Sequence, residues 1–522
     1  MKNRKLPIGI QDFEQIRREN YVYVDKTEYI HRLVHTGKSY FLSRPRRFGK
    51  SLFLSTLKAY WEGKTELFDG LKIGELEKDN ASAWDNYPVL YLDFNTANFR
   101  QENALESVLE KYLNEWEQEY GKTPADAPVG MRFRYILRNA FEKTGKRCVV
   151  LVDEYDKSLL ETVEDEELLE HNRSVFKGFF SALKSEDANI QFVFITGVTK
   201  FSKVSIFSDL NQLEDISFDD NYSGICGITR GELDNDLEDE IATMAGSVDL
   251  SSDDCKEKLK KMYDGYHFSA NGEDVYNPFS LLTALKKHRF GSYWFETGTP
   301  TFLVKRLKAI DFDVKKFSDR TLQATETTIS DYRIDNPNPI PLLYQTGYLT
   351  IKDVEYDDLY TLGFPNEEVR YAFLESLMPE YIEEYTSGSG KDIFTLRRYA
   401  EVGDTDGIRD VLQALFASIT YTTRETPFEH YFQTVIYLVF TLLGKYTQCE
   451  MHTYTGRIDC VVMTKEFIYL FEFKRDKSAE DALGQIEDND YPKSWVADNR
   501  KLYKIGVNFS SETRQMDDWL VR

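Results

Sequence analysis

A basic turn between a short apolar run and a helix-like pattern constrains the fold of this chain more than any other feature. The apolar run is residues 40–43, the turn is Arg44-Pro45-Arg46-Arg47-Phe48-Gly49, and Lys50-Ser51-Leu52 opens an amphipathic helix. Backbone N–H groups at a helix start are unpaired, and the helix dipole favours an anion there. The sequence therefore predicts a strand, a phosphate-binding loop and a helix in succession.

The loop supplies the predicted nucleotide contacts. Lys50 is expected to reach the β- and γ-phosphates of ATP, and the Ser51 hydroxyl is expected to bind Mg²⁺. The residues expected to line the nucleotide are Arg46, Arg47, Phe48, Gly49, Lys50, Ser51 and Leu52. The usual pattern begins with Gly six residues before the lysine, where this chain has Arg44. The three arginines either neutralise phosphates or form a salt-bridged rim, and Gly-Lys-Ser alone also occurs in ordinary loops.

A metal-binding acid is expected at the end of a second apolar strand. Residues 148–152 are apolar, as in a parallel strand buried on both faces, and Asp153 and Glu154 follow. Because ligands bind at the carboxyl ends of such strands, Asp153 is predicted to hold Mg²⁺ and Glu154 to orient or deprotonate the attacking water. Thr196 ends the next predicted strand, where it can touch the γ-phosphate. The alternative is that Asp153 and Glu154 only cap a helix.

Composition and charge restrict the partners of the chain. It has 522 residues and a net charge of −23, so it is expected to fold as several domains and not to bind nucleic acid through its global charge. DNA or RNA would need bound metal or a local basic patch. One candidate patch is Lys256, Lys258, Lys260 and Lys261, which is equally well explained as a solvated helix face.

Cysteine usage and hydropathy favour a cytoplasmic protein. The five cysteines include no Cys-x-x-Cys pair, so we expect buried free thiols in a reducing compartment. The seven histidines do not cluster by spacing, and we assign them no catalytic role. No apolar run is long enough to span a bilayer and no signal peptide is evident. An oligomer is compatible with the sequence but not indicated by it.

Alternating apolar runs and helical patterns predict an α/β fold with a parallel sheet in residues 1–229. The candidate strands are residues 40–43, 89–94, 148–153, 192–196 and 224–228. Residues 230–384 are expected to form a mainly helical coupling region, in which helix, strand, strand, helix fits a winged-helix unit or a helical lid with a hairpin. A Ser-Gly linker precedes residues 392–522, which carry an αβββαβ pattern.

The C-terminal pattern contains a second acidic constellation. Asp459 lies on one predicted strand, and Glu472 and Lys474 project from the same face of the next. Asp459 and Glu472 together can hold a divalent cation that activates water against a phosphodiester, with Lys474 positioning the nucleophile. Glu429, on the preceding helix, is expected to be a supporting metal ligand. The alternative is a surface pair between Glu472 and Lys474 on a charged hairpin.

Two family resemblances follow from these motifs. The segments Tyr23-Val24-Asp25-Lys26-Thr27, Arg44–Leu52 and Asp153-Glu154-Tyr155-Asp156-Lys157 resemble the AAA-ATPase-like domain family, which is common in anaerobic gut bacteria. The resemblance covers about residues 6–290 and implies that residues 24–27 lie near the nucleotide. The pattern of Asp459, Glu472 and Lys474, with Gln485 and Tyr491 on the following helix, resembles a PD-(D/E)XK nuclease domain.

These resemblances imply two competing functions. The first is an enzyme in which Mg²⁺-dependent ATP hydrolysis is coupled to a metal-dependent nuclease domain. The second is a nucleotide-dependent switch whose C-terminal fold binds nucleic acid or protein without cutting it. The sequence does not distinguish DNA from RNA, and it does not identify an arginine finger.

Overall fold

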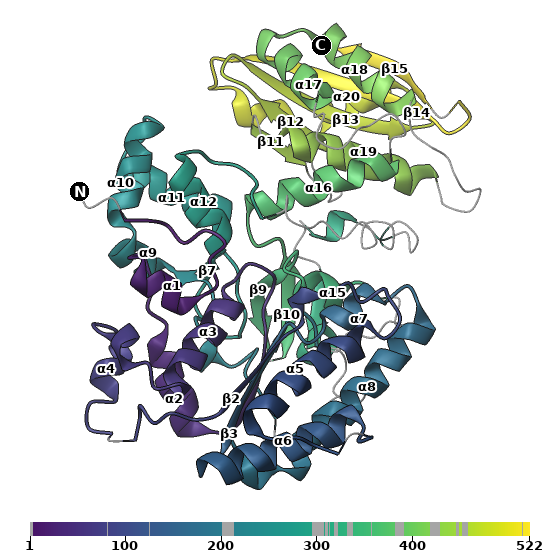
Figure 1. Cartoon of the computed structure of the whole chain (residues 1–522). Coiled ribbons are helices and arrows are strands. Elements are labelled where there is room, and N and C mark those ends of the chain that lie inside the picture. Colours follow the sequence, from purple (N-terminus) through teal and green to yellow (C-terminus); the bar gives the residue numbers. More distant parts are fainter. Residues whose placement is uncertain are drawn as a thin grey trace. The chain divides into compact units, whose positions relative to one another are not determined.

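The computed structural model forms two compact units, one made of residues 1–294 and 323–367, the other of residues 295–322 and 368–522. Figure 1 labels their elements along the chain. The structure describes residues 4–80, 82–124, 126–200, 213–294, 307, 312, 314–317, 322–330, 338–356, 358–381, 391–417, 428–444, 448–451, 458–513 and 515–522. The predicted division at residues 229 and 384 remains a prediction.

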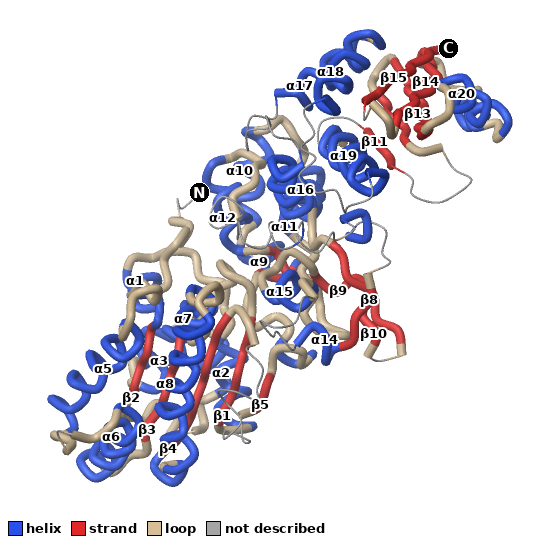
Figure 2. The backbone as a smooth tube through the Cα atoms, turned by 90° about the vertical axis from the view of Figure 1, so that its right-hand side faces the viewer, coloured by secondary structure: helices blue, strands red, loops and turns tan. Residues whose placement is uncertain are grey.

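A five-stranded parallel sheet forms the centre of the first unit, as the apolar runs predicted. Its order is β2-β3-β4-β1-β5, and Figure 2 shows these strands side by side. The strands are β1 (Ser39–Ser43), β2 (Val89–Asp93), β3 (Cys148–Asp153), β4 (Ile190–Gly197) and β5 (Glu214–Asp215). Every residue of β1 and β3 is buried, which explains why β3 is apolar up to Asp153 and why the centre of β1 is apolar. This order inserts β4 between the strand before the loop and the strand that ends at Asp153.

Helices surround this sheet and extend the first unit. Those of the sheet region are α1 (Phe13–Arg18), α2 (Thr27–Thr36), α3 (Lys50–Trp61), α4 (Lys72–Leu76), α5 (Ala104–Tyr120), α6 (Val129–Thr144), α7 (Lys157–Glu161) and α8 (Glu166–Ser185). Those that follow are α9 (Arg230–Asp236), α10 (Glu238–Ser247), α11 (Ser252–Tyr263) and α12 (Pro278–Lys287). The last group forms a separate apolar cluster with Val22 and Tyr293.

One predicted strand of the sheet is wrong. Residues 224–228 do not pair with the sheet; only Ile228 and Thr229 form a strand, β6, which pairs antiparallel with β7 (Val275–Tyr276). The chain turns here because Gly227 takes a left-handed φ of 92°, which glycine adopts readily. The buried Ile225 and Cys226 therefore pack from a loop, and β5 is the strand that borders β1.

The middle region confirms the predicted order of helix, strand, strand, helix. The elements are α15 (Ile340–Gln345), β9 (Thr350–Glu355), β10 (Leu359–Gly363) and α16 (Glu367–Tyr381). The structure adds β8 (Gln323–Thr325) and α14 (Glu326–Ser330), so that β8-β10-β9 is an antiparallel sheet.

The second unit confirms the αβββαβ pattern and adds a strand. Its sheet has the order β11-β12-β13-β14-β15. The strands β13 and β14 pair in parallel, and α20 lies in the connection between them. The elements are α17 (Lys391–Val402), α18 (Thr405–Ala417), α19 (Phe428–Leu443), β11 (Gln448–Met451), β12 (Cys460–Met463), β13 (Phe467–Arg475), α20 (Ala479–Asp488), β14 (Lys501–Ser510) and β15 (Gln515–Val521). Gly506 lets α20 approach β14 closely, because a Cβ there would lie 2.2 Å from the carbonyl oxygen of Ala479.

Candidate functional site

The loop before α3 holds the lysine predicted to bind phosphate. Gly49 takes a left-handed φ of 98° at the N-terminus of α3. The Lys50 side chain turns back across the loop, and its Nζ donates to the carbonyl oxygens of Arg44 at 2.9 Å and Pro45 at 3.1 Å. Lys50 is only 4% exposed. The ammonium is therefore held over the loop by two neutral acceptors that an anion can replace.

Arg44 takes neither of the two roles considered for it. Its side chain is buried, and its guanidinium donates to the carbonyl oxygens of Ser43, Ser217 and Tyr222 at 2.9, 2.8 and 3.2 Å. It also lies 4.3 Å from the ring centroid of Phe268. Arg44 thus connects the loop to the segment after β5 through hydrogen bonds to Ser217 and Tyr222. Because its side chain is buried, it does not reach the surface of the loop.

The other loop residues divide between surface and core. Arg46 and Arg47 are exposed, with the Arg47 guanidinium 4.5 Å from the ring centroid of Phe279. Phe48 is buried and packs edge-on against Tyr266 and Phe268. The Phe48 side chain therefore faces the core, and only its backbone remains for a ligand.

The strand order brings the predicted metal-binding acid and Thr196 together. Thr196 Oγ1 donates to Asp153 Oδ1 at 2.9 Å, because β4 lies directly beside β3. Burial raises the pKa of Asp153 to about 6, opposed by a hydrogen bond from Ser51, the charge of Lys50 and the bond from Thr196. Asp153 thus interacts with both loop residues that the sequence assigned to the nucleotide.

Glu154 follows Asp153 with an unusual backbone. Its φ is 49°, in the left-handed region that non-glycine residues seldom adopt, and it is less buried than Asp153. The next amide, the N–H of Tyr155, donates to the carbonyl oxygen of Thr196 at 3.1 Å. Such backbone strain concentrates at functional sites, and here it turns Glu154 out of the buried strand.

Sequence reasoning missed two residues that organise this edge of the sheet. Asp156 is buried and accepts from the backbone N–H of Val198 and from both the N–H and hydroxyl of Thr199. Gln345, at the end of α15, accepts from the backbone N–H of Lys200 at 2.8 Å. The second contact joins residues 145 positions apart, so no local pattern announces it.

An apolar cavity of about 90 Å³ lies beside the loop. Its lining includes Gly49 and Leu52 from the loop and helix, and Val24 and Lys26 from the N-terminal segment. The family resemblance implied that residues 24–27 lie near the nucleotide, and these residues do adjoin the loop. The Lys26 ammonium is paired with Glu232 at 2.6 Å, which leaves a largely apolar wall.

The second unit brings three predicted residues together. Asp459 precedes β12, which pairs with β13, and Asp459 Oδ2 accepts from the backbone N–H of Phe473 at 2.8 Å. Lys474 Nζ lies 2.8 Å from Glu472 Oε1 and 2.5 Å from Gln485 Oε1. The alternative of a surface ion pair fails, because the side chains of Glu472 and Lys474 are 1% and 16% exposed.

The electrostatics of Glu472 fit a cation. Burial and the neighbouring charge of Asp459 raise the pKa of Glu472 to about 6, with Lys474 opposing them. Its second oxygen, Oε2, is buried and has no hydrogen-bond partner among the described residues. An acceptor without a partner is costly in a protein interior, and a divalent cation held jointly with Asp459 would satisfy it.

Two other predicted site residues are Glu429 and Tyr491. Glu429 lies on α19, but its side chain is outside the described residues. Tyr491 does not belong to α20 as expected; it begins the 3₁₀ turn Tyr491–Trp495, because the chain leaves the helix at Asn489 and Asp490 takes a left-handed φ of 53°.

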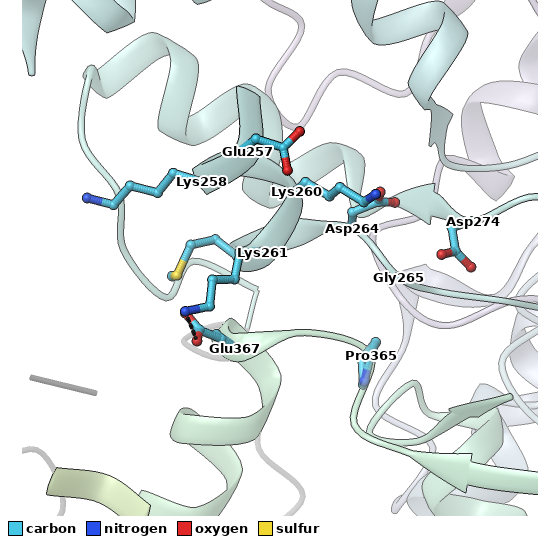
Figure 3. Close-up of a pocket in the computed structure, with 10 residues that line it drawn as sticks. Glu257, Lys258, Lys260, Lys261, Asp264, Gly265, Asp274, Pro365 and Glu367 are labelled. Carbon is cyan, nitrogen blue, oxygen red and sulfur yellow. Dashed lines mark ion pairs between the residues drawn. The ribbon is translucent and has the colours of Figure 1, made fainter. Parts of the chain in front are cut away.

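The lysines of α11 form a mixed-charge surface rather than a basic track. Figure 3 shows three of them around a cavity of about 660 Å³ together with four carboxylates. Lys261 pairs with Glu367 at 2.9 Å, and Lys256 pairs with Asp234 at 2.7 Å. These ion pairs favour the solvated-face interpretation over a phosphate-binding patch.

Asp264, in the same cavity, leads to a prediction about pH. Its Oδ1 is buried without a hydrogen-bond partner in the described structure, and burial raises its pKa to about 6. The folded state therefore binds this proton more tightly, so the associated stability is present at low pH and is lost as pH rises from about 4 to 6. Asp264→Asn should flatten this dependence and raise the free energy of unfolding at pH 7 by on the order of 1–3 kcal/mol.

Urea unfolding at pH 5 and pH 7 measures this effect. Glu257→Gln is the matched control, because Glu257 lines the same cavity but is exposed. Equal pH dependence in Asp264→Asn and the wild type would contradict the assignment.

Comparisons with known proteins agree with this architecture. A family model described as predicted AAA-ATPase matches residues 7–207, and one described as PD-(D/E)XK nuclease superfamily matches residues 427–519. The chain is 36% identical over 536 residues to an "Uncharacterized protein in vnfD 5'region" of Azotobacter chroococcum mcd 1, covering 100% of this chain and 99% of that protein. In the part of the chain that the structure describes, no helix has the length and apolar character needed to cross a membrane. The chain carries a predicted AAA-ATPase domain and a C-terminal domain of the PD-(D/E)XK nuclease superfamily, and it belongs to the same family as the Azotobacter protein.

Proposed function

We propose that the first unit binds Mg-ATP and hydrolyses it. The observation that carries this proposal is the convergence of Lys50, Ser51 and Thr196 on Asp153. Ser51 and Asp153 would hold the ion, which when bound would offset the negative charge of the phosphates. Lys50 would exchange its two carbonyl acceptors for the β- and γ-phosphates. Glu154 would orient the attacking water and take its proton, and Thr196 would fix the carboxylate of Asp153.

The apolar cavity beside Gly49 is the proposed site of the base. Gly49, over which the phosphates would lie, belongs to its lining, and the largely apolar character of that lining suits an aromatic ring. Lys26 faces this wall with its charge already neutralised by Glu232, so an uncharged ring can enter without leaving a buried cation unpaired.

Calorimetry with Mg-ATP tests binding. Lys50→Ala should weaken Mg-ATP binding by about 100-fold or more, because it removes charge-assisted hydrogen bonds to phosphate. Lys58→Ala is the control: Lys58 lies on the same helix and makes an ion pair with Glu62 at 3.7 Å with a 43% exposed side chain. Equal heats in the wild type and Lys50→Ala, or no heat in either, would end the ATP-binding proposal.

We also propose that the second unit cleaves nucleic-acid phosphodiesters with the help of a divalent cation. The observation that carries this proposal is Glu472 Oε2, which lies buried beside Asp459 and has no hydrogen-bond partner in the described part of the chain. Asp459 and Glu472 would hold the ion, with Glu429 as a supporting ligand; when bound, the ion lowers the pKa of water and offsets charge on the phosphate. Lys474, held by Glu472 and Gln485, would position the nucleophile.

Metal-dependent cutting of DNA and RNA by the purified full-length chain tests the second proposal. Nucleic acid that is bound but never cut would support the non-cleaving switch instead. Coupling between the two units is part of the proposal, in that nucleotide binding and hydrolysis would change the rate of nucleic-acid cleavage. Cleavage rates measured with ATP, with ADP and without nucleotide test this coupling.

A further inference from the structure

Two histidines and one glutamate form a cluster away from both proposed sites. His31 and His35 lie four residues apart on α2, so they share one face of the helix, and their ring centroids are 4.4 Å apart. Glu77 directly follows α4, which Figure 1 shows next to α2. One ligand atom from each of the three residues lies within 4.8 Å of the other two.

The spacing of these atoms suits a small cation. Glu77 Oε1 lies 2.8 Å from His35 Nε2 and 4.0 Å from His31 Nε2. Metal–ligand bonds of ~2.0–2.2 Å around a tetrahedral ion separate neighbouring donors by roughly 3.3–3.5 Å. The two observed distances bracket this value.

Burial of Glu77 supplies the electrostatic reason for a cation. Its side chain is 1% exposed, and within the described residues its ion pairs come from the two histidines and from no lysine or arginine. Asn80 Nδ2 donates to the other carboxylate oxygen at 2.8 Å, which orients the group as a supporting hydrogen bond orients a metal ligand. A buried carboxylate without a permanent cation partner is costly, and a bound metal would remove that cost.

We propose that His31, His35 and Glu77 bind one Zn²⁺ ion. Imidazole nitrogens select zinc over magnesium, which prefers oxygen donors, so the site differs in kind from those proposed at Asp153 and Glu472. The His31 and His35 side chains are 31% and 43% exposed, which leaves the fourth position to water. This inference is independent of the proposed ATPase and nuclease activities.

The site would fasten α2 to α4 at a second point. At the start of α2, Thr27 Oγ1 accepts from the backbone N–H of Ile73 at 3.1 Å, and Asp25 accepts from that of Lys72 at 2.7 Å. The histidines lie one and two turns further along α2. Val24 and Lys26 line the apolar cavity beside Gly49 and directly precede α2. Zinc would therefore stabilise the packing of the helix that adjoins this cavity.

Zinc titration of the full-length chain against a chromophoric chelator, in excess Mg²⁺, tests the proposal. The excess Mg²⁺ occupies oxygen-only sites, and the described cysteines are buried. The double variant His31→Ala, His35→Ala should bind one equivalent fewer than the wild type, and Glu77→Gln should bind that ion at least about tenfold more weakly. Zinc should raise the melting temperature of the wild type but not of the double variant.

His171→Ala is the matched control. His171 also pairs with a single glutamate, Glu106, across two helices, but it lacks a second histidine beside it, so its loss should leave zinc binding unchanged. Metal-free circular dichroism establishes that each variant folds. Zinc stoichiometry and affinity that are equal in the wild type and the double variant, or no zinc binding by the wild type, would overturn the proposal.

Discussion

Glu154→Gln should abolish most ATP turnover while Mg-ATP binding persists. Glutamine keeps the size of the side chain but cannot take a proton from water, and loss of a general base typically costs about 10²–10⁴-fold in rate. The left-handed backbone at Glu154 is unchanged by the substitution, so the side chain keeps its direction. Phosphate release measures turnover, and calorimetry measures binding.

Glu166→Gln is the control for this experiment, because Glu166 is exposed in the first turn of α8. Turnover in Glu154→Gln equal to that of the wild type would remove Glu154 from the proposed role. Loss of Mg-ATP binding in the same variant would assign it to ligand binding instead.

Glu472→Gln should reduce nucleic-acid cleavage by about 10³-fold or more. The change removes one of two carboxylates that would hold the cation, and such an ion contributes several kcal/mol of charge stabilisation. The pKa of about 6 adds a pH dependence: below this pH the carboxyl is protonated and competes with the cation, so cleavage by the wild type should fall as pH drops through 6. Gel assays with Mg²⁺ or Mn²⁺ at pH 5 to 8 measure both effects.

The matched control is Glu466→Gln, just before β13 in the exposed turn of the same hairpin. ATP binding by Glu472→Gln should equal that of the wild type, since the two sites lie in different compact units. Equal cleavage rates in the wild type and in Glu472→Gln would refute the proposed centre.

Local patterns predicted much of the fold and of both sites. Short apolar runs predicted β1, β2, β3 and β4, and the polar residues at the carboxyl ends of β3 and β4 singled out Asp153 and Thr196 as candidates. The spacing predicted that Asp459 and Glu472 lie close together. Asp459 accepts from the backbone N–H of Phe473, next to Glu472, although it precedes β12 rather than lying on that strand. These features succeed because each is encoded within about fifteen residues.

Features that depend on distant partners could not be predicted in the same way. Arg44 was expected to neutralise phosphates or to form a salt-bridged rim, and its actual acceptors at Ser217 and Tyr222 could not be foreseen because they lie more than 170 residues away. Residues 224–228 looked like a strand because a short apolar run does not distinguish a strand from a buried loop. No histidine cluster was predicted, because His31 and His35 have no third ligand nearby in the sequence: Glu77 is 42 residues further along the chain than His35.

The buried arginine beneath the phosphate loop has a thermodynamic consequence. A glycine at that position would leave the loop many accessible conformations, and a ligand would have to select one of them at an entropic cost. Here three carbonyl groups and an aromatic ring fix the guanidinium. The loop is preorganised by folding, so the free energy of the proposed nucleotide contacts would go into affinity rather than into ordering the backbone.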